Sequence, residues 1–288
     1  MKRFADTCFL LLLMTLTGSV GAAVSLAGTR PFPVTLKPEA ANAFAKYVQI
    51  TEARNAAEIT AQDFLWADGL SGKDREDAFA ALKRGDVVIS RLESKDGNKE
   101  ISFPGAMVHH WIGTIFVPGA SLDEVLKVLQ DYNHQSLYYA PDVEQSQIEA
   151  HEGDSYRVHL RFRRRMVVTV VMDTEHQIQY FRDSATTAHS RSSATRISEV
   201  EDPDEKDEHF DPPGHDDGYL WRMETWWRMV ERDGGVYLQS EAVSLTRDIP
   251  TGLGWMVGPF VTSVPKVSLK FTLEATRKAV TEQEKAAK

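Results

Sequence analysis

Cysteine is almost absent from this sequence, since Cys8 is the only one. It lies in a leader that we expect to be removed, so the mature chain should contain no disulfide and no cysteine nucleophile. Positive charge is also in short supply, with 33 Lys and Arg against 42 Asp and Glu and a net charge of −9. This balance argues against a nucleic acid partner and against strong binding to anionic lipid through bulk charge.

Long hydrophobic runs are missing after the first two dozen residues. A membrane-spanning helix needs about 20 apolar residues, and no later stretch reaches that length. The N-terminus has the order of a secretory signal: a basic start, an apolar run over residues 9–16, and then small residues up to Ala22 and Ala23. We expect residues 1–23 to be a signal peptide cleaved near Ala22 or Ala23, and the mature protein to be periplasmic or secreted.

Motifs for nucleophilic and nucleotide chemistry are missing too. The sequence has no Gly-x-Ser-x-Gly elbow and no phosphate loop. His109 and His110 are adjacent and would point to opposite faces of a strand, and the histidines at 209 and 215 lie in an acidic loop without the calcium-loop pattern. We therefore expect no metal and no cofactor, and the sequence identifies no catalytic residue.

The N-terminal part is predicted to be helical. Apolar residues at helical spacing predict one helix over residues 38–59 and a second over 73–83, ending at Gly85. A turn at 95–98 carries a hairpin signal. We assign residues 24–100 to a helical extension with a leading hairpin, packed on the main domain.

The remainder reads as an antiparallel sheet with two helices. A strand over 107–117 precedes a capping box at Ser121, and alternating residues then predict mostly strands from 155 to 245. Residues 201–217 read as a solvated acidic loop. A final helix over 265–280 is the natural cover for the open face of the sheet, and residues 281–288 form a polar tail. The fold class is α+β.

The late hairpin around Asp233-Gly234 is the most informative segment. A two- or four-residue turn would place wide side chains opposite small ones on one face: Trp221, Met223, Thr225, Trp227 and Met229 beside Leu238, Ser240, Ala242 and Ser244. This pairing leaves room for a ligand, although plain core packing fits the same pattern.

The other face of the hairpin carries charges among aromatic residues. If it faces water, its charges form weak surface pairs. If it faces a cavity, Arg222 and Glu241 become anchors for a ligand head group. A basic run along the strand after Ser155, which includes Arg161 and Arg163, could contact an anionic lipid surface or a partner. We favour a solvent-exposed strand face, with the 201–217 loop as a source of counter-charge.

Short motifs in order resemble the START-like (SRPBCC) superfamily, which includes polyketide cyclase/dehydrase-like, coenzyme Q-binding and lipid-transfer proteins. The first motifs follow the capping-box helix, and the others close the chain: Asp131-Tyr132, Tyr139-x-Pro141-x-Val143, Ser146, Asp233-Gly234-Gly235-Val236, Ile249-Pro250, Trp255, Pro259, Val264-Pro265 and Leu273-x-x-x-Arg277. The likeness covers residues 101–280, which we take as the main domain.

The resemblance implies a helix-grip fold, in which a seven-stranded antiparallel sheet wraps a long C-terminal helix around an apolar pocket. From it and the hairpin we expect an exported carrier of a lipid, quinone or aromatic compound, with transient membrane contact. The expected ligand-pocket residues are Tyr132, Tyr139, Trp221, Arg222, Met223, Trp227, Glu241, Trp255 and Phe260. One alternative is a cyclase- or hydrolase-like enzyme using Glu241, Arg222 or Tyr139. Another is an interaction module docking a partner through the N-terminal helices.

Overall fold

The computed structural model describes residues 34–61, 63–165, 169–249 and 254–287, and for residues 254–262, 284, 286 and 287 it describes the backbone only. Residues Pro33–Lys288 form one compact unit. The expected signal peptide lies outside the described residues.

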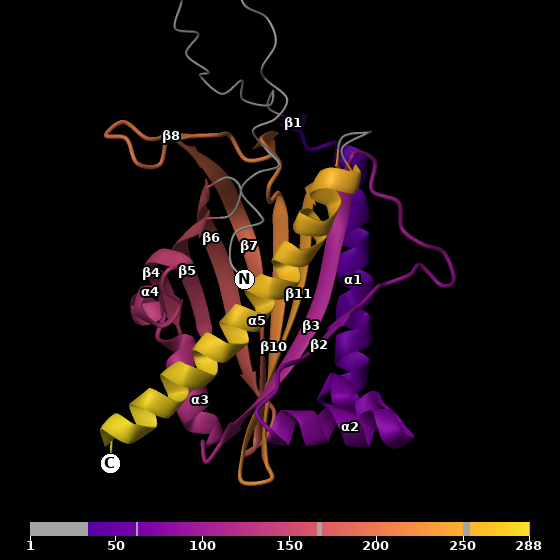
Figure 1. Ribbon diagram of the computed structural model, residues 1–288, viewed down its shortest axis with the longest axis vertical. Coiled ribbons are helices and arrows are strands. Elements are labelled where there is room, and N and C mark those ends of the chain that lie inside the picture. The colour runs from indigo at the N-terminus through magenta and orange to yellow at the C-terminus, as the bar shows by residue number, and fades with distance from the viewer. Residues whose placement is uncertain (1–33, 62, 166–168, 250–253, 288) are drawn as a thin grey trace, which may run out of the picture. The chain divides into compact units, whose positions relative to one another are not determined.

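One large antiparallel sheet dominates this unit (Figure 1). Its strands follow the order β2-β3-β11-β10-β7-β6-β5-β4, and β8 pairs with β7. The strands are β2 (Val88–Arg91), β3 (Ala106–Pro118), β4 (Val143–Glu152), β5 (Ser155–Arg165), β6 (Thr169–Arg182), β7 (Thr187–Glu201), β8 (His209–Phe210), β10 (Arg222–Arg232) and β11 (Gly235–Arg247). The sheet has nine strands instead of the seven implied by the resemblance, since β2 and the two-residue β8 also join it.

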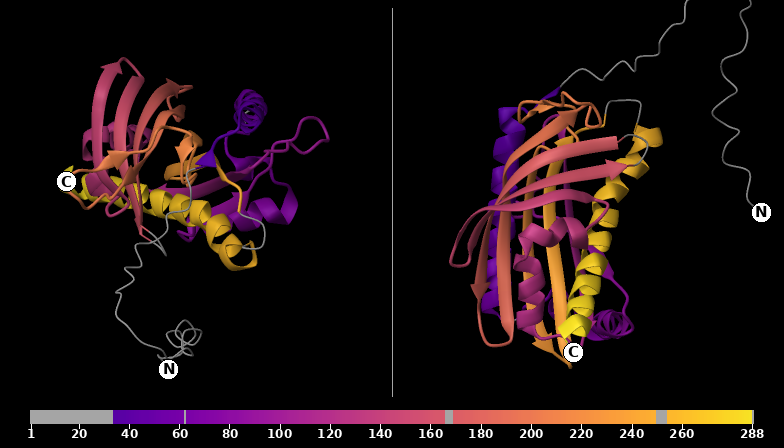
Figure 2. Two further views of the ribbon diagram at one scale, coloured as in Figure 1. Left: turned by 90° about the horizontal axis from the view of Figure 1, so that it is seen from above. Right: turned by 90° about the vertical axis from the view of Figure 1, so that its left-hand side faces the viewer.

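The C-terminal helix α5 (Gly254–Ala287) lies across one face of the sheet, here called the concave face (Figures 1 and 2). It packs tightly on β3 at Gly113, where a Cβ atom would lie 2.7 Å from Cδ1 of Leu273 and 3.2 Å from Cδ2 of Leu269. The absent side chain thus lets the helix approach the strand. The helix is longer than expected at both ends, and the predicted polar tail continues it to Ala287.

The opposite face, here called the convex face, is covered by the N-terminal helix α1 (Pro38–Thr60), close to the predicted 38–59. Phe44, Tyr47 and Val48 of α1 pack with Trp226 and Val243 of the sheet. The second helix, α2 (Gly72–Lys83), follows the short η1 turn (Trp66–Gly69), and both lie beside the Asp233-Gly234 end of the sheet. A two-stranded sheet joins β1 (Val34–Thr35) to β9 (His215–Asp216).

Local signals proved accurate around the hairpin and the capping box. Arg232 pairs with Gly235, so the turn has two residues, and the predicted cross-strand partners such as Trp227 and Ser240 are confirmed. Ser121 caps α3 (Leu122–Gln130), accepting from the Glu124 amide at 3.3 Å. A short η2 turn (Tyr132–His134) and α4 (Gln135–Tyr138) lead into β4, a strand that alternation did not predict.

The prediction that Arg161 and Arg163 face water was wrong. Both are buried on β5, at 7% and 8% exposure. Arg161 donates to Glu208 at 2.6 Å and to Asp173 at 3.0 Å, and Arg163 pairs with Asp204 at 3.1 Å. The acidic loop does supply counter-charge, as predicted, but it folds over the arginines and removes them from solvent.

Candidate functional site

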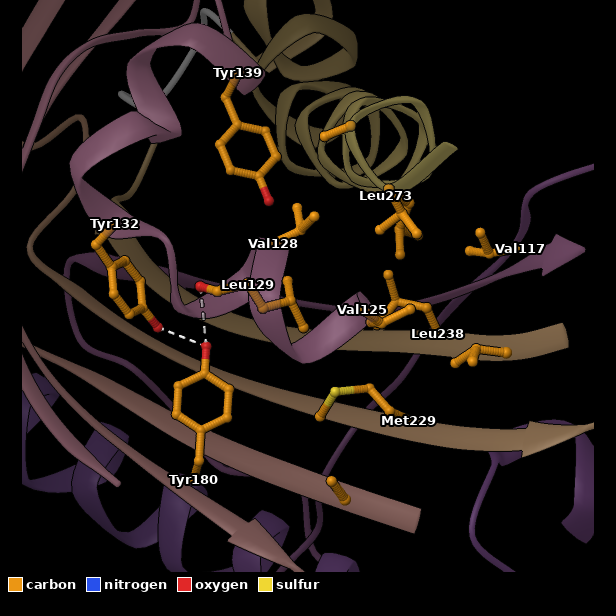
Figure 3. Close-up of a cluster of buried hydrophobic side chains, with 14 of the residues drawn as sticks. Val117, Val125, Val128, Leu129, Tyr132, Tyr139, Tyr180, Met229, Leu238 and Leu273 are labelled. Carbon is orange, nitrogen blue, oxygen red and sulfur yellow. Dashed lines mark hydrogen bonds between the residues drawn. The ribbon is translucent and has the colours of Figure 1, made fainter. Parts of the chain in front are cut away.

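One end of the space between the sheet and α5 is closed by side chains (Figure 3). Leu238 and Met229 from the sheet, Val125 from α3 and Leu273 from α5 are all completely buried there. The hydroxyl of Tyr180 donates to the Leu129 carbonyl at 3.2 Å and lies 2.7 Å from the Tyr132 hydroxyl. Polar atoms at this end are thus satisfied within the protein.

Side chains on the same concave face become less buried with distance from that closed end. Successive residues of β11 and β10 change from fully buried at Leu238 and Met229 to half-buried at Ala242 and Thr225. The half-buried side chains on this face are Trp111, Ser192, Met223, Thr225, Trp227, Ala242 and Ser244. These interior strand positions are therefore not completely covered.

Cross-strand pairing arranges these residues in three rows. The first row, next to the closed end, runs through Gly113, Ser240, Trp227, Ser190 and Tyr180. The second runs through Trp111, Ala242, Thr225, Ser192 and Ile178. The third contains His109, Ser244, Met223 and His176. Wide indole rings thus sit beside serine and alanine, which is the juxtaposition that leaves space.

The residues named in the three rows include polar groups but no Asp, Glu, Lys or Arg. Two cations border the second row at Trp111: Arg91 of β2 pairs with it, and Nζ of Lys266 lies 5.8 Å from its ring centroid. Burial, together with the nearby charge of Arg91, lowers the pKa of His109 to about 4. Burial likewise lowers the pKa of His176 to about 4, with His159 contributing. Both rings are therefore neutral near pH 7.

A curved antiparallel sheet with a long C-terminal helix across its concave face defines the architecture. The fold is a helix-grip fold. In a helix-grip protein the candidate ligand site is the surface between sheet and helix, which here is the set of three rows and the part of α5 above them.

Two of the expected pocket residues lie on the half-buried rows, namely Met223 and Trp227. Two others, Tyr132 and Tyr139, lie in the closed end at 5% and 7% exposure. The Tyr139 hydroxyl is 2.9 Å from Oγ1 of Thr276, and burial raises its pKa to about 12. The phenol therefore stays protonated at neutral pH. The side chains of Trp255 and Phe260 lie outside the described residues.

Three expected pocket residues do not face α5. Trp221 lies just before β10, so the alternation of that strand does not fix the side on which it lies. It packs with Trp226 and Val243 in the cluster that also contains residues of α1, and its indole N–H donates to Asp216 at 2.7 Å. Arg222 and Glu241 alternate onto the convex face. The sequence offered water or a cavity as the surroundings of that face, and neither describes Glu241, because α1 covers it.

Glu241 belongs to a buried polar network between α1 and the sheet. It is 1% exposed, accepts from Nε2 of His110 at 2.6 Å and pairs with Arg54 of α1. Burial alone would raise its pKa, but the His110 hydrogen bond and the charges of Arg54, His110 and Arg228 together hold the pKa below its usual value. The structure therefore does not bring Tyr139, Arg222 and Glu241 together as an acid–base set.

Sequence reasoning missed Ser190, Ser192 and His176. Nothing local marks them as interior, because their strands β6 and β7 pair through a register shift between Glu175 and His176. Trp111 could have been found, since it alternates with Ile115 and Val117 along a predicted strand.

No protein-family model matches the chain, and no curated protein matches it either. Among solved structures, similar folds include a STAR-related lipid transfer protein from Xanthomonas axonopodis, at 19% identity and TM-score 0.43, covering 67% of this chain and 98% of that one. The Zhui aromatase/cyclase from Streptomyces sp. R1128 has 15% identity, TM-score 0.41 and coverages of 63% and 98%. Human STARD10 has 10% identity, TM-score 0.42 and coverages of 75% and 82%.

No helix among the described residues is long and apolar enough to cross a bilayer. Within the same part of the chain, no three His, Cys, Asp or Glu side chains gather as a metal site would require.

Proposed function

We propose that this protein is an exported carrier that binds an apolar small molecule, lipid-like or aromatic, on the concave face beneath α5. The observation that carries the proposal is the loss of burial along β10 and β11, from Met229 and Leu238 to Thr225 and Ala242. A helix-grip core that served stability alone would be expected to fill this region as completely as the closed end.

Apolar burial supplies the affinity in this proposal. The half-buried rows offer the indole rings of Trp111 and Trp227 and the thioether of Met223. A ligand that removes apolar surface from water gains roughly 25 cal/mol per Å², less the cost of ordering. The proposal that the protein is exported rests on the N-terminal sequence pattern. The proposal that it carries its ligand instead of converting it rests on the described residues of this face, which include no acid–base set.

Filling the proposed site should block binding. Ala242 lies between Trp111 and Thr225, and Ala242→Phe would place a ring over the second row. Ala150→Phe, at an exposed position of β4, makes the same change in size outside the site. We expect the neutral probe N-phenyl-1-naphthylamine to fluoresce on the delipidated protein, and Ala242→Phe to weaken its affinity about tenfold, or about 1.4 kcal/mol.

Native mass spectrometry of protein from its own host complements this titration. An apolar molecule that co-purifies with the parent chain and is lost in Ala242→Phe supports the carrier proposal. A probe that fails to bind the parent protein, or that binds both variants equally, contradicts it. A co-purifying molecule that is chemically altered on incubation would favour the enzymatic alternative.

A further inference from the structure

Ser190 stands out among the buried polar groups of the concave face. It is 1% exposed, and its Oγ has no hydrogen-bond partner. A buried hydroxyl without a partner costs on the order of 1–3 kcal/mol. A ligand bound against the half-buried Trp227, with which Ser190 pairs, could supply the missing partner.

The position of Ser190 supports this reading. Pairing puts it between Trp227 of β10 and Tyr180 of β6, in the row next to the closed end. Ala188, two residues earlier on the same face, belongs to the filled core. Ser192, two residues later, is half-buried. Ser190 therefore lies on the floor of the candidate site, where the deepest part of a ligand would rest.

The neighbouring polar groups are uncharged and already engaged with one another. Nε2 of His176 lies 2.9 Å from Oγ1 of Thr174, which donates to the Leu160 carbonyl at 3.1 Å. The hydroxyl of Ser192 is 3.4 Å from Nδ1 of His176. This chain of contacts crosses β7, β6 and β5 and leaves only Ser190 among these four side chains with an open oxygen.

We infer that the floor of the site receives an uncharged hydrogen-bonding group, a hydroxyl or a carbonyl, at the end of the ligand's apolar body, with Ser190 Oγ as its partner. The inference rests on the proposed function and narrows its ligand class. A carboxylate or phosphate is disfavoured at that end, because the residues that β10, β7 and β6 place on this face around Ser190 include no Lys or Arg to compensate a buried charge. Arg91 and Lys266 lie at the other edge of the rows, beside Trp111 of β3.

Three probes of similar size separate these possibilities at about pH 7: naphthalene, 2-naphthol and 2-naphthoate. We expect 2-naphthol to bind more tightly than naphthalene by a few-fold to about tenfold, which is the contribution of one net hydrogen bond. We expect 2-naphthoate to bind most weakly. The readout is a fluorescence titration of the full mature chain.

Ser190→Ala tests the partner directly. Because the hydroxyl bonds nothing in the protein, the variant should fold as stably as the parent. It should bind naphthalene unchanged and lose the preference for 2-naphthol. The matched control is Ser198→Ala on the same strand, where the hydroxyl accepts from Arg196 at 3.1 Å on the convex face. That variant should keep the preference.

The outcomes are distinguishable. Equal affinities for naphthalene and 2-naphthol on the parent chain, or a preference that survives Ser190→Ala, would overturn the role of Ser190 while leaving the carrier function standing. Tight binding of 2-naphthoate would overturn the uncharged class. If none of the three probes binds, the proposed function itself fails.

Discussion

Replacing Glu241 should loosen α1 from the sheet without affecting the candidate ligand site. Its carboxylate is the shared partner of His110 and Arg54, at 1% exposure, and the buried Arg228 lies close enough to influence it electrostatically. Removing one partner of a buried ion pair costs about 3–5 kcal/mol because the remaining charge stays uncompensated. Arg54 is 31% exposed and can regain some hydration, so we place Glu241→Gln near the lower end, about 3 kcal/mol.

That loss is large enough to measure by two methods. In a chain of this size it corresponds to a fall in melting temperature of about 10 °C, and urea unfolding should show a lower midpoint with an unchanged slope. Glu175→Gln is the matched control, since Glu175 pairs with Arg196 at 2.7 Å near the surface and should contribute no more than about 1 kcal/mol.

The same variant separates two roles for Glu241. If Glu241 holds α1 against β11, Glu241→Gln should lower the free energy of unfolding and leave the affinity for N-phenyl-1-naphthylamine unchanged. If Glu241 instead anchors a ligand, as the hairpin alternation alone allowed, the variant should lower that affinity and leave the free energy of unfolding unchanged. The second result, or a stability within about 1 kcal/mol of the parent, would refute our reading of the convex face.

Two further predictions concern the frame of the sheet. Gly235→Ala should abolish soluble expression or lower the melting temperature strongly, because its Cβ would lie 2.4 Å from the backbone oxygen of Val117, which cannot rotate away; an unchanged melting curve would contradict this. Burial and the neighbouring Asp216 raise the pKa of Glu199 to about 8. The folded chain thus holds a proton that the unfolded chain has released, so this carboxyl's contribution to stability is present below about pH 4.5 and is lost as pH rises towards 8. Urea unfolding from pH 5 to 8.5 should show that decline, and Glu199→Gln should flatten it.

Local signals were sufficient for α1, for the start of α3 and for the late hairpin. The capping box at Ser121, the spacing of Phe44 and Tyr47, and Asp-Gly at the turn each depend on residues that are neighbours in sequence. Those signals predicted the boundaries of α1 closely, and they predicted the pairing of β10 with β11 on condition of a two- or four-residue turn, which the two-residue turn fulfils.

Long-range contacts could not be read in the same way. Both faces of β10 carry aromatic residues, Trp226 on one and Trp227 on the other, so alternation did not reveal which face α5 covers. Arg161 looked like a surface residue because its three carboxylate partners come from β4, β6 and the acidic loop. The placement of Ser190 depended on pairing across three strands, which no local pattern encodes.

The helix α1 is synthesised before the strands of the sheet on which it packs. Its partner Glu241 lies 187 residues beyond Arg54, so during synthesis most of the chain must leave the ribosome before the seat of α1 exists. Until then the rings of Phe44 and Tyr47 cannot be buried against the sheet. Contacts between residues so far apart in sequence slow folding and prolong the exposure of apolar surface. Nascent chains of this protein should therefore depend on holdase chaperones for longer than a chain with its helices only at the C-terminal end.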